Sequence, residues 1–277
     1  MDVFAAFIAP ALAGVFVGVM SGLLGVGGGT IMVPIFRLAF GMSPLASTAT
    51  SLFAIIPTSI SGVVAHTRAK TCVPKLGLAL GVGGAVMSPV GVWLASVSPG
   101  WLVICVAAVV IGFSAFKMFK KAVKCAPAPR AGRAGGNVQA ASAKAVPDQP
   151  VLSRKQYLQG ACIGLIAGLA SGYVGVGGGF IMVPLMLAVL DIPMSLASGT
   201  SLIAIMILAI PGVIEQGLLG NIEYLAGIAI VVGSIPGALV GARLVRMVPE
   251  RQLRFIFGGF LLVAAVMLML NEFGILG

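Results

Sequence analysis

The sequence predicts an all-α integral membrane protein built from two inverted halves, each with four long helices and one short helix. Three observations point to this fold class. Only 9% of the 277 residues are charged and 59% are hydrophobic, whereas about a quarter are charged in soluble domains. Apolar segments of membrane-spanning length recur along the chain. The second half also repeats the first at a constant offset of 150 residues, as in 175 − 25.

Eight apolar segments come close to the ~20 residues that a helix needs to cross a bilayer. We expect them at 3–24, 45–65, 74–96, 99–119, 156–174, 194–214, 222–245 and 252–271. Two shorter segments, 30–40 and 180–190, follow glycine runs. At roughly 1.5 Å per residue each of them covers about half a bilayer, so each half contains one short helix that meets its partner near the midplane.

Several polar residues have the position of helix N-caps. Ser43 and Ser98 each stand directly before a proline, which is typical of an N-cap followed by proline at the first helical position. Thr71 and Asn221 occupy equivalent positions before later segments. We expect all four residues to cap helices.

A different composition separates the two halves. Residues 120–155 are rich in alanine, proline, glycine and basic residues. Such a segment buries little apolar surface and is typical of a linker. The chain therefore divides into a membrane repeat at 1–119, a basic linker at 120–155 and a second membrane repeat at 156–277.

Charge decides how the two repeats are oriented. Basic residues in the linker, in the loop at 66–75 and in the loop at 243–254 place these segments in the cytoplasm. The loop at 215–223 carries two glutamates and no base, so we expect it outside. Loops 66–75 and 216–225 are equivalent by the repeat, yet they fall on opposite sides. The repeats are therefore expected to be inverted, as in many transporters, with both termini outside; Arg37 alone disagrees, because it falls near an extracellular end.

The repeated glycine strings predict a binding site. SGLLGVGGGTIMVP at 21–34 and SGYVGVGGGFIMVP at 171–184 differ at three positions. Glycines let backbone N–H groups approach a ligand, and the helix that follows adds its partial positive charge. Two such breaks would form an anion site near the midplane. The candidate site residues are Gly27, Gly28, Gly29, Thr30, Thr50, Ser51, Gly177, Gly178, Gly179, Thr200 and Ser201.

Other interpretations of these residues remain to be weighed. Glycines in membrane helices often serve close packing. This is our interpretation of the positions spaced by four in each half, which are Gly83, Met87 and Gly91 in the first and Gly233, Gly237 and Gly241 in the second. A nucleotide-binding loop does not fit, because the strings lack the P-loop lysine and Thr30 breaks the G-x-G-x-x-G pattern. For the hydroxyls, the alternative is a hydrogen bond to a carbonyl one turn back in the same helix.

The remaining polar residues indicate no cofactor and no metal site. The four cysteines lack metal-binding spacing, and the basic residues lie between apolar segments and not in a nucleic-acid-binding patch. His66, the single histidine, is expected at a solvated loop end beside Arg68. No carboxylate lies deep in a span, so the sequence names no coupling ion.

The paired glycine strings, with the T-S-L segments at 46–52 and 197–202, resemble the TauE/SafE sulfite exporter-like family, also called the toluene sulfonate uptake permease family. This resemblance covers nearly the whole chain except the linker. It implies a secondary transporter, often an exporter, of small sulfur-containing anions such as sulfite or organosulfonates, for example sulfoacetate. It implies no enzyme activity.

Two functional classes stay open on the sequence alone, a carrier with alternating access and an anion channel built from the same breaks. A membrane sensor is a weaker third, because the sequence contains no soluble sensory domain. The expected partners are a small anion and the lipid bilayer, with a homodimer left open. The expected location is the plasma (inner) membrane, as a multi-pass protein.

Overall fold

The computed structural model describes residues 3–124, 153–174 and 177–272, which form helices and no strand. As expected, each half contains four long helices and one short one. The elements are α1 (Val3–Leu24), α2 (Gly29–Leu38), α3 (Pro44–Arg68), α4 (Pro74–Val97), α5 (Gly100–Lys124), α6 (Arg154–Val174), α7 (Gly179–Leu185), a π-helical turn η1 (Met186–Leu190), α8 (Met194–Leu218), α9 (Tyr224–Leu244) and α10 (Glu250–Glu272).

Helix boundaries follow the sequence repeat. α3 and α8 begin at Pro44 and Met194, and α4 and α9 begin at Pro74 and Tyr224, so that both offsets are 150 (194 − 44 and 224 − 74). α5 ends at Lys124 and α6 begins at Arg154, so both helices extend a short way into the segment expected to be the linker. The rest of that segment, 125–152, lies outside the described residues.

One of the four expected N-caps is confirmed. The Ala46 N–H donates to the Ser43 hydroxyl oxygen at 3.2 Å, and a proline follows Ser43 at the first helical position. The expectation for Ser98 is wrong, because its hydroxyl donates back to the Leu94 carbonyl at 2.8 Å and α5 begins only at Gly100.

The expectation for Thr71 and Asn221 is also wrong. Both side chains bond to the end of the preceding helix, Thr71 to His66 and Asn221 to Gln216, with 2.8 Å between the bonded atoms in each case. The helices that follow begin three residues later (74 − 71 and 224 − 221). Each residue therefore closes a loop onto the helix before it.

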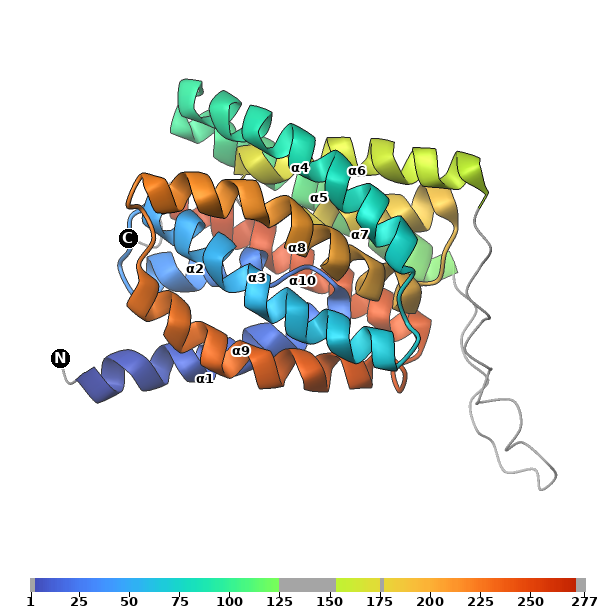
Figure 1. Ribbon diagram of the computed structural model, residues 1–277, viewed down its shortest axis with the longest axis horizontal. Coiled ribbons are helices and arrows are strands. Elements are labelled where there is room, and N and C mark those ends of the chain that lie inside the picture. Colours follow the sequence, from blue (N-terminus) through green and yellow to red (C-terminus); the bar gives the residue numbers. More distant parts are fainter. Residues whose placement is uncertain (1–2, 125–152, 175–176, 273–277) are drawn as a thin grey trace.

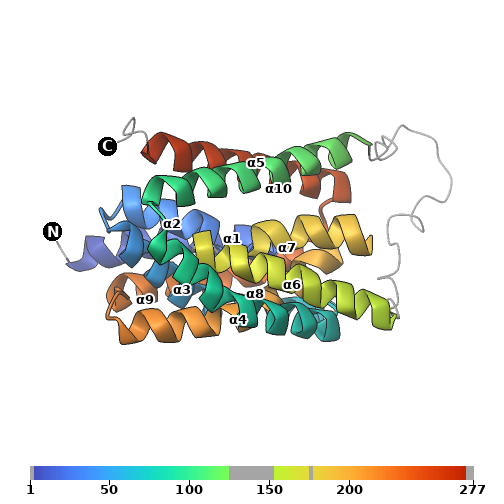
Figure 2. The same cartoon turned by 90° about the horizontal axis from the view of Figure 1, so that it is seen from above.

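Helix packing pairs elements from opposite halves. α1 lies on α9 and α6 lies on α4, two pairs that are equivalent by the repeat, while α3 and α8 contact each other at the centre. α5 and α10 form a separate layer against the rest (Figure 2). Glycines bring the backbones together: a Cβ on Gly18 would lie 2.2 Å from the Ser234 carbonyl oxygen, and one on Gly168 would lie 2.2 Å from that of Gly84. The packing role expected for Gly83 is confirmed, because its Cβ would lie 2.5 Å from the Ala161 oxygen.

Helix directions divide the helix ends between two opposite ends of the molecule (Figure 1). In Figure 1, α1 begins and α10 ends at the left, whereas α5 ends and α6 begins at the right. α3 runs from left to right and α8 from right to left. The loops that follow α3 and α9 also lie at the right end.

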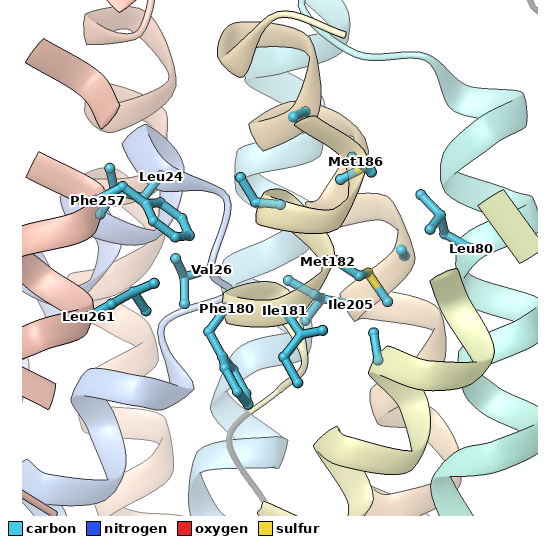
Figure 3. Close-up of a cluster of buried hydrophobic side chains, with 14 of the residues drawn as sticks. Leu24, Val26, Leu80, Phe180, Ile181, Met182, Met186, Ile205, Phe257 and Leu261 are labelled. Atoms are coloured by element: carbon cyan, nitrogen blue, oxygen red, sulfur yellow. The ribbon is translucent and has the colours of Figure 1, made fainter. Parts of the chain in front are cut away.

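The buried core surrounds α7. Figure 3 shows Phe180 and Met182 of α7 between α10, with Phe257 and Leu261, on one side and Leu80 of α4 on the other. Outer helix faces expose large apolar side chains instead. Among the described residues, four helices are long and apolar enough to cross a membrane, namely Leu45–Arg68, Pro74–Leu94, Met194–Leu218 and Tyr224–Leu244. This arrangement is that of a multi-pass membrane protein.

The close contact of α6 with α4 makes a testable prediction. Gly168→Ala should lower stability by about 1–3 kcal/mol, because the added methyl would overlap the Gly84 backbone. Gly112→Ala on α5 is the matched control: nothing lies within 4 Å of its Cβ position, so better helix propensity should leave stability unchanged or raise it. Thermal unfolding of the two variants in detergent measures the difference, and equal midpoints would contradict the packing role of Gly168.

Candidate functional site

Each half contains a break between two helices at a glycine run. Gly27 and Gly28 have φ angles of 80° and 82°, and Gly177 and Gly178 have 87° and 68°, a left-handed conformation that side chains disfavour. Gly28 and Gly178 are the N-caps of α2 and α7, and neither helix is capped by a side chain. Gly175, also part of the predicted break, lies outside the described residues.

The two glycine runs lie against each other. A Cβ on Gly179 would be 2.8 Å from both the Gly25 carbonyl oxygen and the Val26 Cα, so only glycine fits at this crossing. Beside the crossing, a Cβ on Gly27 would lie 2.8 Å from Cγ2 of Ile205 and one on Gly177 would lie 3.0 Å from Cδ1 of Ile55. The two isoleucines are equivalent by the repeat (205 − 55 = 150) and occupy the middle of α8 and α3.

Ser201 and Ser51 are equivalent residues with different surroundings. The Ser201 hydroxyl donates to the Gly25 carbonyl at 2.6 Å, with the Ser198 carbonyl as a second acceptor at 2.8 Å. The Ser51 hydroxyl is fully buried and has no hydrogen-bond partner. Ser51 lies one helical turn from Ile55 and therefore on the same face of α3. A buried hydroxyl without a partner is costly, and this hydroxyl is able to donate a hydrogen bond to a ligand.

Two more buried hydroxyls without a partner lie near the N-terminus of α2, one on α2 itself and one on α1. Thr30 and Ser21 are buried and have no partner. The Ser21 Cβ lies 3.7 Å from the position that a Cβ on Gly28 would occupy. The first turn of a helix leaves N–H groups without intrahelical acceptors and carries a partial positive charge. Our sequence analysis did not select Ser21, although it stands inside the repeated string and has a serine, Ser171, at the equivalent position.

Thr50 and Thr200 connect the two halves. The Thr50 hydroxyl oxygen accepts the Glu223 N–H, and that of Thr200 accepts the Val73 N–H, both at 3.0 Å. Each contact fixes the residue that directly precedes α9 or α4. Because a hydroxyl can accept and donate at once, each threonine keeps its hydrogen for another partner.

The expected solvated position of His66 is wrong. The side chain is 0% exposed, and its Nε2 lies 2.9 Å from the Gly22 carbonyl oxygen of α1. Its Nδ1 lies 2.8 Å from the Thr71 hydroxyl oxygen. The end of α1 and Gly199 of α8 cover it: a Cβ on Gly199 would lie 2.8 Å from Nδ1, so the imidazole occupies space that glycine leaves free. Helix ends are not always solvated, and the sequence pattern of α3 alone did not indicate these neighbours.

The chemistry of the breaks suits a small anion. They offer hydroxyl and N–H donors, and no group of three His, Cys, Asp or Glu side chains that could hold a metal occurs among the described residues. A separate groove of about 500 Å³ lies on another side of α7, between α4, α5 and α6. Its lining is apolar apart from Ser114 and Tyr173, so it does not suit a small charged ligand.

An all-helical bundle with several apolar spans and two helix breaks in its interior defines the class of integral membrane proteins. The chain belongs to the sulfite exporter TauE/SafE family, whose model matches residues 10–268. This confirms the family resemblance.

Several curated relatives are similar over most of their length. The probable membrane transporter proteins YunE and YdhB of Bacillus subtilis are 27% and 28% identical, over 87% and 84% of this chain and 89% and 88% of their own. The probable membrane transporter protein MJ0441 of Methanocaldococcus jannaschii is 24% identical over 94% of both chains. No solved structure matches the chain. The family and these relatives are transporters and not enzymes, which agrees with the sequence analysis.

The different surroundings of Ser201 and Ser51 predict different effects on stability. Ser201→Ala should cost about 1–3 kcal/mol, because the buried Gly25 carbonyl loses its donor. Ser51→Ala should leave the free energy of unfolding unchanged or raise it slightly, because the alanine removes a buried hydroxyl that has no partner. Unfolding in detergent without added anion compares the pair, and an equal loss in both variants would contradict the assigned roles.

Proposed function

We propose that the chain is a secondary transporter that exports small sulfur-containing anions, such as sulfite or organosulfonates, by alternating access. The observation that carries the proposal is the N-terminus of α2, where Gly28 provides no cap and the buried hydroxyls of Ser21 and Thr30 have no partner. These hydroxyls are hydrogen-bond donors near the first turn of α2 that have no protein acceptor among the described residues. The family description supplies the substrate class and the direction of transport.

The site binds an anion through partial charges. Backbone N–H groups at Gly29 and Thr30 and the hydroxyls of Ser21 and Ser51 supply donors in this proposal, and the dipole of α2 adds to them. The second half supplies the equivalent side of the site in this proposal, through Gly177, Gly178, Gly179, Thr200 and Ser201. No lysine or arginine takes part in this proposal, so the anion contacts only hydrogen-bond donors and the helix dipole, and it is released readily. A cation finds no acceptor cluster there.

Inverted repeats make alternating access possible in this proposal. Three features support inversion: equivalent helices such as α3 and α8 run in opposite directions (Figure 1), the contacts α1–α9 and α6–α4 are reciprocal, and the basic loops share the end at which α5 ends and α6 begins. We therefore assign that end to the cytoplasm and both termini to the outside of the plasma membrane. Rocking of one half against the other would open each break to its own side.

The alternative function, an anion channel, is less well supported. A channel needs a continuous polar path, whereas Ile55 and Ile205 fill the space beside the crossing of the two glycine runs. Apolar side chains at this position favour a carrier, in which the path opens on one side at a time.

Anion affinity tests the proposed site. Thr30→Val and Ser51→Ala should each weaken sulfite binding about tenfold, because a hydrogen bond to a charged group contributes about 1.5–3 kcal/mol. Ser98→Ala is the control, because it removes an exposed hydroxyl that is remote in the sequence from Thr30 and Ser51. This variant should bind sulfite as the wild type does. Calorimetry on the purified proteins gives the affinities, and efflux of radiolabelled sulfite from proteoliposomes gives the transport rates. Wild-type affinity in both site variants would contradict the site; no binding by the wild type would contradict the function.

A further inference from the structure

His66 is a buried titratable side chain to which the proposed transport assigns no task. Because the Gly22 carbonyl can only accept, Nε2 carries a hydrogen and donates it. In the neutral imidazole, Nδ1 then accepts from the Thr71 hydroxyl. Histidine is the side chain that ordinarily changes charge between pH 5 and 8, so its burial in the bundle calls for an explanation.

The second half holds an uncharged version of the same contact. Gln216 and Asn221 are the equivalents of His66 and Thr71 (216 − 66 = 221 − 71 = 150). The Asn221 side-chain amide donates to the Gln216 side-chain oxygen at 2.8 Å. An amide pair closes the loop just as well, so closing the loop does not require a group that titrates.

The surroundings of His66 can accept a proton without rearrangement of the backbone. The Thr71 hydroxyl oxygen lies 3.3 Å from the His66 carbonyl oxygen, which is a second acceptor for its hydrogen. When Nδ1 gains a proton, that N–H donates to the Thr71 oxygen and the Thr71 hydrogen turns to this carbonyl. Every hydrogen of the imidazolium then has an acceptor.

His66 also contacts two elements beside the crossing, the end of α1 and α8. Gly22 is three residues before Gly25 on α1, about 4.5 Å of helix rise, and Gly199 is two residues before Ser201 on α8. Gly25 and Ser201 are themselves joined by a hydrogen bond. A charge on the imidazole therefore acts close to the proposed anion, in a medium of low dielectric constant.

The charged groups around His66 leave it without a carboxylate partner among the described residues. α1 carries no charged side chain in Val3–Leu24, and the single charge on α8, Glu215, lies 16 residues beyond Gly199 (215 − 199). The remaining titratable groups on the elements packed there, and in the segment from 243 to 254, are the cations Arg68, Lys70, Lys75, Arg243, Arg246, Arg251 and Arg254, the thiol of Cys72, the phenol of Tyr224 and Glu250. The negative charge that would stabilise an imidazolium has to come from the ligand.

We propose that His66 is a proton-binding site coupled to the anion site, so that the transporter carries one proton with each anion. The proposal rests on the proposed function. A proton from the aqueous side adds to the Nδ1 lone pair when an anion occupies the glycine break, and it returns to water when the anion leaves. A monovalent anion then crosses as an electrically neutral pair with its proton. Net export proceeds as long as the outward concentration gradient of the anion exceeds the inward concentration gradient of protons.

Nitrogen NMR reports this proton directly, because the chain contains one histidine. The full-length protein, labelled with ¹⁵N-histidine and purified without a histidine tag, should show the neutral Nε2–H tautomer at pH 7.5. Added sulfite should raise the ratio of imidazolium to neutral imidazole by about tenfold or more. A neutral imidazole from pH 8 to pH 5 with sulfite bound overturns the proton site and leaves the proposed function intact. No sulfite binding at all overturns the proposed function and the coupling with it.

The second half supplies a matched variant for transport. His66→Gln combined with Thr71→Asn reproduces the Gln216–Asn221 pair. The double variant should fold as the wild type does and should bind sulfite with an affinity that no longer rises as the pH falls, because coupled binding is reciprocal. In proteoliposomes with a pH gradient, the wild type should accumulate the anion about tenfold for each pH unit, and the double variant should not accumulate it. pH-driven accumulation by the double variant overturns the proposal. If the double variant does not fold, the NMR titration of the wild type decides.

Discussion

The structure depends on one crossing, where the two chain breaks meet inside the bundle. In lipid, a peptide group that leaves a helix must find a partner within the protein. At this crossing the Gly25 carbonyl accepts a hydrogen bond from the Ser201 hydroxyl. The absence of a side chain at Gly179 lets the backbone of the second glycine run approach that of the first. The helices around the crossing pack through further glycines, so the whole bundle is arranged to bring these two backbones together.

The two halves are equivalent in path but differ in chemistry. In the second half, Ser201 is bonded to Gly25, and Gln216 is bonded to Asn221. In the first half, the equivalent Ser51 has no partner, and the residue in place of Gln216 is the titratable His66. We infer that the second half holds the crossing in place, whereas the first half provides the free donors and the proton site.

The sequence predicted the parts of the fold that depend on local pattern. The glycine strings marked both breaks, and the 150-residue offset gave helix starts that agree between the halves at Pro44 and Met194. Contacts between distant segments were beyond such patterns. Burial of His66 depends on Gly22 and Gly199, which are far away in the chain, and nothing local to α3 indicates them. The cap positions of Thr71 and Asn221 were mistaken for a different reason. Each side chain bonds to a residue only five positions back, at the end of the preceding helix, and a polar residue before a helix has the same sequence pattern whether it caps that helix or closes the loop.

The central claim is that the glycine breaks bind an oxyanion, and the most direct measurement is the position of a bound anion. Selenite has the shape and charge of sulfite, and its selenium scatters X-rays anomalously. A crystal structure with selenite should show an anomalous peak at the N-terminus of α2, within hydrogen-bonding distance of the Thr30 hydroxyl. A peak in the apolar groove between α5 and α6, or at the basic loops alone, would contradict the account.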